Sequence, residues 1–378
     1  MKGSVLEEIR LLRGSALPDF NRKNTNRYRV LIREADGSDT AYYFSAPIYR
    51  AQNGSLVELR FRESGGNFRF TGSNATVTVS ADDLLLDGPE GALRAFLACG
   101  RTVVTGRAVK SARAEIFPAL NGAAVKWRCS GGVPLRMRLE AARSFLTVRA
   151  NTKCFAWMGE PHKPFCVISA IGSLDAYGRF LGPAVMTYRR HDERNNTVEM
   201  IPCSAAAEWI FFEITLYERK LIHDTTVENK NPLENNAFGG TAFLGTSETF
   251  GEQWLYLRPD ASCLALRGGA LRRVVLHLPK FDAGTGAIKA FGLSRRFCSF
   301  GSAWENKIDF TAPVAESVSG TQYYHLDLSN LLIDPRTAFL RETEGVVLQT
   351  KEKGTGFTVI SAGDNSYRPQ ILEINFRK

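Results

Sequence analysis

The sequence lacks the features that mark membrane spans and secretion leaders. No run approaches the roughly 18 consecutive apolar residues that suggest a transmembrane helix. Near the start, Glu7, Glu8 and Arg10 fall where a signal peptide has its uninterrupted apolar core. We therefore expect no membrane insertion. The localisation stays open between a cell-surface or extracellular protein without a recognisable signal peptide and a particle-associated protein.

Motifs for the common catalytic chemistries are also absent. The sequence has no HExxH, no GxSxG, no GxxxxGK[ST] and no GxGxxG, which removes the usual metalloprotease, serine-hydrolase and nucleotide-binding signatures. The five histidines are scattered, and His223 and Asp224, adjacent on a predicted strand, would point to opposite faces. We expect a non-catalytic protein with no cofactor and no metal site.

Carboxylates could serve two other functions, as the catalytic pair of a glycosidase or as calcium ligands. The catalytic pair of a glycosidase is defined by distance in space, so its candidates are acidic residues near the strongest strand and in the C-terminal part: Glu208, Glu213, Glu218, Glu305 and Asp309. Two oxygen-rich turns have the chemistry of calcium ligands: Asp224 with Asn235 and Asn236, and Asp364 with Asn365. Neither has the spacing of a known calcium loop, so we interpret both as turns.

Cysteine spacing excludes a zinc knuckle or a thioredoxin-type site. The seven cysteines are an odd number, lie far apart and form no CxxC. Several have apolar neighbours, as in LACG around Cys99, PFCVIS around Cys166 and SCLAL around Cys263. We interpret them as buried thiols rather than disulfides, which suits assembly in a reducing compartment.

What the chain does have is the composition of a globular protein with excess positive charge. Of its 378 residues 44% are hydrophobic, and 24 are Phe, which is ample for packed cores. That length predicts two or three domains. The formal net charge of +9 attracts polyanions, and we expect a polysaccharide or an acidic wall polymer as the partner rather than nucleic acid.

Alternating apolar and polar residues predict an all-β fold. Leu56–Arg62 and Ala75–Ser80 both place apolar side chains on one face and polar ones on the other. This period buries one face of a strand and leaves the other in water, as in antiparallel sheets. Many short strands separated by turn signals predict tandem antiparallel β-sandwiches.

Only two segments have helical character. Val5, Ile9 and Leu12 form the apolar stripe of a short amphipathic N-terminal helix. Gly91–Cys99 is a second candidate for a helix, although its Phe96-Leu97 pair suits a strand equally well. The predicted fold is therefore sheet throughout, with a short helix at the start.

The stretch Asp224–Gly245 is the predicted boundary between domains. It is rich in Asn, Pro and Gly, which break regular structure for different reasons. It follows the strongest strand, WIFFEITLY at residues 209–217, and precedes a clean series of short strands. We expect residues 1–222 to form a β-sandwich region of one or two sandwiches. Residues 223–378 should form a jelly-roll-like sandwich.

The C-terminal part carries short motifs in a particular order. They are Asp-Thr-Thr-Val at 224–227 with Asn235, Gly239 and Leu244-Gly245, LHLPKF at 276–281, the segment 297–308 with Trp304 and Asn306, HLDLS at 325–329, GVVL at 345–348, FTVIS at 357–361 and RPQIL at 368–372. Over about residues 222–378 this order resembles the disaggregatase-related (DNRLRE) β-sandwich domain. The first half is only loosely similar to the region that precedes such domains in wall-associated proteins.

The resemblance implies a sandwich related to carbohydrate-binding modules. Such sandwiches commonly bind glycans with exposed aromatic side chains that stack on sugar faces. Trp304, in a Gly- and Ser-rich loop, is the first candidate ligand-binding residue. Arg295 and Arg296 precede it along the chain, and Tyr323 and Tyr367 are further candidates.

We therefore expect a non-catalytic structural or adhesive protein that binds a glycan or a cell-wall polymer at a surface. One alternative is a structural component of a virion, spore or secretion particle. It would assemble with its own copies or with particle proteins through the N-terminal helix or an edge strand. The second alternative is a polysaccharide-degrading enzyme.

Overall fold

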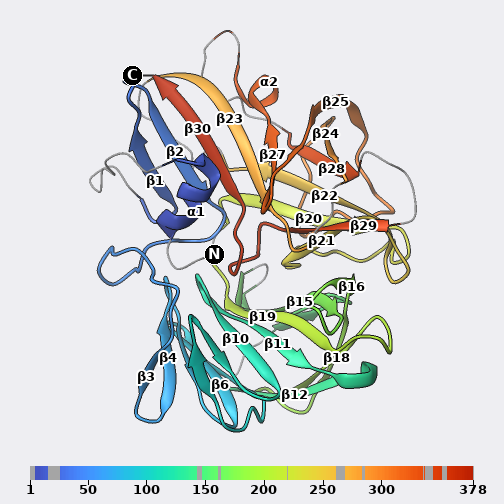
Figure 1. The fold of residues 1–378 in the computed structure, drawn as a ribbon. Helices are drawn as coiled ribbons and strands as arrows, with labels where there is room; N and C mark the ends of the chain where they lie inside the picture. The colour runs from blue at the N-terminus through green and yellow to red at the C-terminus, as the bar shows by residue number, and fades with distance from the viewer. Residues whose placement is uncertain are drawn as a thin grey trace. The chain divides into compact units, whose positions relative to one another are not determined.

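The fold consists of four antiparallel sheets and very little helix (Figure 1). The computed structural model describes residues 5–15, 26–142, 147–160, 163–218, 220–260, 269–282, 286–334, 336, 344–350 and 356–377. Within these ranges the helices are α1 (Val5–Arg13), α2 (Ser329–Leu332) and the 3₁₀ turn η2 (Ser130–Gly132). The predictions of an all-β class and a short N-terminal helix are confirmed. None of the described helices has the length and apolar character needed to cross a bilayer.

The chain forms two compact units that are not consecutive in sequence. The split unit contains Met1–Tyr49, Arg219–Ala237 and Thr241–Lys378, and the inserted unit contains Arg50–Glu218 with Phe238–Gly240. The expected division at residue 222 therefore differs from the observed one in where the first 49 residues belong. They join the C-terminal part because β2 (Asp39–Phe44) pairs along its whole length with β30 (Ile371–Arg377).

The split unit has a sheet of six strands and a sheet of seven. The six-stranded order is β1 (Arg29–Arg33), β2, β30, β23 (Ala270–Pro279), β27 (Tyr323–Asp327) and β26 (Val318–Ser319). The seven-stranded order is β25 (Phe310–Glu316), β24 (Ile288–Leu293), β28 (Val346–Thr350), β22 (Gly251–Pro259), β21 (Thr241–Ser247) and β29 (Gly356–Ser361), with β20 (Ile222–Glu228) also paired to β22.

The inner faces of these two sheets share one hydrophobic core. Alternate residues Leu276 and Leu278 of β23, and Leu372 and Ile374 of β30, pack with Leu255 of β22 and with apolar residues of β21, β24 and β28. Because successive side chains of a strand alternate between faces, the intervening residues lie on the outer faces. The split unit is thus a β-sandwich with two outer faces available for other roles.

Helix α1 covers part of the outer face of the six-stranded sheet (Figure 1). Its Val5 and Ile9 are fully buried, as its apolar stripe predicts. Tyr323 of β27 donates its hydroxyl hydrogen bond to the buried Glu8. At the other end of the helix, Arg13 pairs with Glu34, with Nη1 2.6 Å from Oε1.

The inserted unit has a nine-stranded and an eight-stranded sheet. The nine-stranded order is β13 (Thr147–Ala150), β14 (Cys154–Glu160), β15 (Lys163–Leu174), β19 (Trp209–Leu216), β11 (Gly122–Arg128), β10 (Ala114–Ala119), β9 (Ala108–Lys110) and β8 (Val103–Thr105), with β16 (Phe180–Gly182) beside β15. The eight-stranded order is β17 (Val185–Arg190), β18 (Asn195–Ile201), β12 (Leu135–Ala141), β7 (Gly91–Phe96), β6 (Asp83–Gly88), β5 (Thr76–Val79), β4 (Asn67–Thr71) and β3 (Arg62–Ser64).

Three local predictions differ from the structure. Within Gly91–Cys99 the chain forms strand β7 (Gly91–Phe96) rather than a helix, because it closes a hairpin with β6 in which Leu93 and Ala95 point into the core. Leu56–Arg62 keeps the predicted alternation of burial, yet a strand begins only at Arg62. The Asn-rich residues 229–240 connect two strands of the split unit, β20 and β21, although residues 238–240 belong to the inserted unit.

Candidate functional site

The segment that carries Trp304 lies over the outer face of the seven-stranded sheet. This segment, residues 294–309, connects β24 to β25 and buries Phe297 and Ile308 against Tyr256. The backbone N–H of Ile308 donates to the Tyr256 hydroxyl at 3.1 Å. These contacts fix the segment on the sheet, so Trp304 has a defined position.

The Asn-rich loop supports the same segment from the side. The Asn235 amide donates to the carbonyls of Ser299 at 2.7 Å and Ser302 at 2.9 Å. The backbone N–H of Glu305 donates to the Pro232 carbonyl at 2.9 Å. The turn-forming residues of this loop therefore hold the Trp304 segment in place.

Four aromatic rings meet on this outer face and form what we call the aromatic surface, namely Trp254, Phe291, Trp304 and Phe310. The Trp254 and Trp304 ring centroids are 4.6 Å apart, and Phe310 lies 5.5 Å from Trp254 and 5.0 Å from Phe291. Trp254 is nearly buried, whereas the other three are partly exposed or exposed. Trp304 is therefore less exposed than its loop sequence predicts, because it packs on Trp254.

Cationic groups surround the aromatic surface. The Lys307 ammonium lies over the Trp304 ring, 5.0 Å from its centroid, in a cation–π contact. Arg295 and Arg296 are exposed on the same segment. Burial raises the pKa of the Tyr256 hydroxyl, and the nearby Arg295 partly offsets that effect. Three of the five predicted site residues thus share one segment, namely Arg295, Arg296 and Trp304.

The other two predicted residues lie elsewhere in the split unit. Tyr323 is on the outer face of the six-stranded sheet, where it is buried and hydrogen-bonded to Glu8 of α1. Tyr367 is in the connection between β29 and β30 and stacks on Phe281, with centroids 6.5 Å apart. Because the two sheets face each other across the core, Tyr323 and Trp304 lie on opposite outer faces.

A histidine pair that the sequence did not single out lies beside Tyr323. His277 of β23 and His325 of β27 are cross-strand partners, with their Nδ1 atoms 2.7 Å apart. His277 Nε2 is 3.2 Å from Glu373 Oε2 on β30. Burial, and next the neighbouring His277, lower the pKa of His325 to about 4. The two histidines meet because of the register between β23 and β27, and the sequence of either strand alone does not reveal that register.

A second buried ionic cluster ties the start of β20 to the connection before β30. Lys220 Nζ is 3.0 Å from Asp224 Oδ1 and also binds Asp364 and the Ala237 carbonyl. Asp224 accepts a hydrogen bond from the Gly363 N–H at 3.0 Å. Burial raises the pKa of Asp364, and the Lys220 ammonium opposes this effect. The two Asp residues considered for calcium are thus bound by a lysine.

Within the ranges that the structure describes, no group of three or more His, Cys, Asp or Glu side chains is placed to hold a metal ion. Glu305 is exposed and Glu213 is buried in β19, far apart in the chain and in different units. The six described cysteines are free thiols, and Cys99, Cys129, Cys154 and Cys166 are buried. Cys263 lies outside the described residues.

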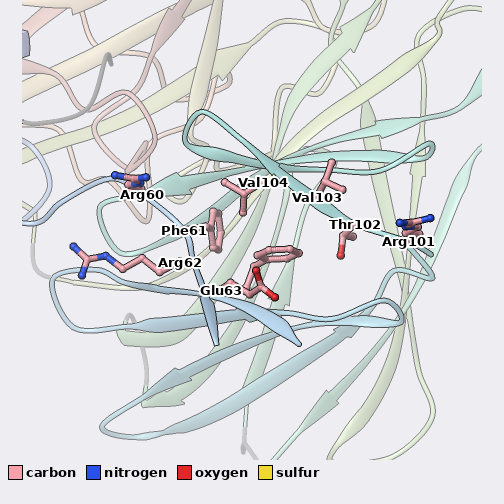
Figure 2. Close-up of a pocket in the computed structure, with 9 residues that line it drawn as sticks. Arg60, Phe61, Arg62, Glu63, Arg101, Thr102, Val103 and Val104 are labelled. Carbon is pink, nitrogen blue, oxygen red and sulfur yellow. The ribbon is translucent and has the colours of Figure 1, made fainter. Parts of the chain in front are cut away.

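The inserted unit has a hollow of about 570 Å³ beside two short edge strands (Figure 2). We call it the arginine groove. Its lining consists of Arg60, Phe61, Arg62, Glu63, Phe68, Arg101, Thr102, Val103 and Val104. In Figure 2, Arg60 and Arg62 lie at one end and Arg101 at the other, with Phe61, Val103 and Val104 between them. No sequence motif marks this site, because its two sides come from separate hairpins, β3–β4 and β8–β9.

Comparison with known proteins gives no assignment. No protein-family model matches the sequence. No curated protein sequence matches it either. The function must therefore be inferred from the described residues and their geometry.

Proposed function

We propose that this chain is a non-catalytic β-sandwich protein that binds an acidic polysaccharide or wall polymer through the aromatic surface of its split unit. The observation that carries the proposal is the contact of four aromatic rings on one outer sheet face, three of them partly or more exposed. Aromatic faces offer apolar area and a negative quadrupole to the C–H groups of a sugar ring.

The charges around this surface favour an acidic ligand. Lys307, Arg295 and Arg296 are exposed on the segment that carries Trp304. Exposed cations raise the local concentration of a polyanion and speed its association, and salt screens this effect. An outer sheet face with aromatic rings and cations suits the side of a long polymer. Adhesion would then come from many weak contacts along the polymer.

Affinity electrophoresis in gels that contain polygalacturonate, with dextran gels as the neutral comparison, tests this proposal. We expect the wild type to be retarded by polygalacturonate, and Trp304→Ala and Lys307→Ala each to weaken the retardation, Trp304→Ala by about tenfold, or about 1.4 kcal/mol. Tyr177→Ala is the matched control, because Tyr177 is an 86% exposed aromatic residue of the inserted unit. Equal retardation of the wild type and both surface variants would remove the aromatic surface as the binding site.

The relation to the disaggregatase-related domain is part of the same proposal. Its support is the order of the motifs and their place in one sheet. LHLPKF ends β23, HLDLS begins in β27, and RPQIL leads into β30. These three strands are neighbours in the six-stranded sheet, so the motifs describe a contiguous structural element.

Self-assembly through the N-terminal helix has less support than polymer binding. The apolar residues Val5 and Ile9 of α1 are already buried, and Glu8 is hydrogen-bonded to Tyr323. A helix that uses its apolar stripe within the chain has no such stripe left for a second copy. The edge-strand form of the assembly alternative keeps its structural basis, since each sheet has a largely exposed edge strand, namely β26, β25, β8 and β3.

A further inference from the structure

The arginine groove is bounded by two strand edges. β3 ends the eight-stranded sheet and β8 ends the nine-stranded sheet, and all three residues of each strand are exposed. In the part of the chain that the structure describes, no strand pairs with the outer side of either one. Backbone donors and acceptors along such an edge are available to an added strand.

The charges of the groove are unequal. Three arginines line it against a single carboxylate, that of Glu63. Arg62 has an exposed ion pair with Glu58, in which Nη2 lies 2.6 Å from Oε2. Among the described residues, neither Arg60 nor Arg101 has a carboxylate within salt-bridge distance. Two exposed guanidinium groups at opposite ends of the groove thus have no counter-ion among the described residues.

The middle of the groove is apolar. Phe61 and Phe68 are buried at its base, and Val103 and Val104 are 52% and 36% exposed. Exposed valines on a three-residue edge strand leave apolar area uncovered at the position where a neighbouring strand would lie. An occupant therefore needs an apolar part between two anionic ends.

We propose that the arginine groove binds an acidic, extended segment of a partner protein, which adds as a strand to the edge of β8. Consecutive apolar side chains in the middle of that segment would cover Val103 and Val104, which point to opposite faces of β8, and its carboxylates would pair with Arg60 and Arg62 at one end and with Arg101 at the other. The edge arginines repel basic strands, so the same residues that admit an acidic segment exclude others. Two open strand edges favour a peptide over an acidic glycan, because only a peptide completes the backbone ladder.

Fluorescence anisotropy with the full chain and labelled peptides tests the mode of binding. The probe is a nine-residue peptide with three Val between two runs of three Glu, and the comparison peptide has Lys in place of every Glu. Two further versions of the acidic peptide carry N-methyl groups on the odd or on the even residues. In strand addition only alternate N–H groups face the edge, so we expect one methylated version to lose binding by at least about tenfold and the other to keep it.

Paired variants test the place of binding. Arg60→Glu with Arg101→Glu should weaken the acidic peptide by about tenfold or more, since two favourable charge contacts become repulsive. Arg113→Glu with Arg189→Glu makes the same change of charge at exposed sites of the inserted unit outside the groove, and should leave binding within about twofold. Equal weakening by both pairs, or equal binding of both methylated peptides, would overturn the proposal. So would displacement of the peptide by polygalacturonate with no effect of methylation, which would make the groove a polyanion site.

Discussion

The two units bury charge to different extents. Among the described residues, the split unit buries Glu8, Asp39, Lys220, Asp224, Glu228, His277 and Lys280, whereas the inserted unit buries Lys153 and Glu213. A buried charge needs a partner, because desolvation is costly. In the split unit these partners come from distant parts of the chain, as with Lys220 and Asp364 or Glu8 and Tyr323. Ionic contacts thus join the segments of the unit that is interrupted in sequence.

The largest expected effect is the loss of the whole split unit when residues 1–49 are removed. The truncation deletes β1 and β2, removes Leu31, Ala41 and Tyr43 from the core and leaves β30 paired on one side only, with β23. The stabilisation lost with these two strands should exceed the roughly 5–15 kcal/mol by which folded domains are stable. Hydrogen exchange read by mass spectrometry should show β23 and β30 unprotected while β11 and β19 of the inserted unit stay protected.

A shorter truncation, of residues 1–15, is the control for that experiment. It removes α1 but leaves β1 and β2, so protection of β30 should fall only in part. If β30 stays protected after loss of residues 1–49, the split unit does not depend on its first strands.

The next largest effect is a loss of unfolding free energy, which should be greater at a buried ion cluster than at an exposed ion pair. Lys220→Met leaves the carboxylates of Asp224 and Asp364 together without their cation, which should cost about 3–5 kcal/mol of unfolding free energy. Arg136→Met breaks an exposed pair of the inserted unit, 2.7 Å from Glu199, and should cost less than about 1 kcal/mol. Denaturant unfolding measures both.

The pH dependence of Lys220→Met checks the cause. Ionised carboxylates repel each other, so this variant should lose stability as pH rises and regain part of it in acid. A loss that is equal at all pH values would point to packing rather than charge.

A smaller effect is expected from the histidine pair. The pKa of His325 is lowered to about 4, from about 6.5 in an unfolded chain. The folded state then binds fewer protons than the unfolded state between these values. Stability from this group is therefore complete above about pH 6.5 and is lost as pH falls toward 4. We expect a loss on the order of 1–2 kcal/mol, discounted because His325 is only half-buried.

Two variants assign that pH dependence to one unit. His325→Gln should flatten the stability profile of the split unit between pH 6.5 and 4. His191→Gln, at an exposed histidine of the inserted unit, should leave the profile unchanged. A wild-type profile that is already flat in this range contradicts the argument.

The smallest effect concerns thiol reactivity and should leave stability unchanged. Cys298 is exposed on the Trp304 segment, whereas Cys99 and Cys166 of the inserted unit are buried. Burial raises the pKa of Cys99 to about 11, which keeps it as the less reactive thiol. Brief iodoacetamide treatment followed by peptide mapping should modify Cys298 first, and faster labelling of Cys99 would contradict its burial.

Patterns within single strands were predictable, whereas the contacts between them were not. Alternation at Val77 and Val79 gave the correct inward face of β5, and WIFFEITLY became the central strand β19. The pairing of β2 with β30 joins residues more than three hundred positions apart, and no local preference encodes it. The loop sequence around Trp304 predicted an exposed aromatic residue, but the packing of Trp304 on Trp254 depends on tertiary structure.

The arginine groove shows the same limit more strongly. Arg60 and Arg101 have no shared motif, and each alone is an ordinary surface residue. They share a site only because the edges β3 and β8 both border one hollow. Charge and alternation can be read directly from a sequence. A site composed of two sheet edges can be predicted only when the order of the strands in both sheets is known.

The pairing of β2 with β30 also has a consequence for synthesis on the ribosome. β1 and β2 are made long before their partner, since β30 spans Ile371–Arg377. The inserted unit is complete soon after residue 240 is made, so it can fold while β1 and β2 still lack their partner. Proteolysis of stalled nascent chains should therefore find a protected middle before a protected beginning.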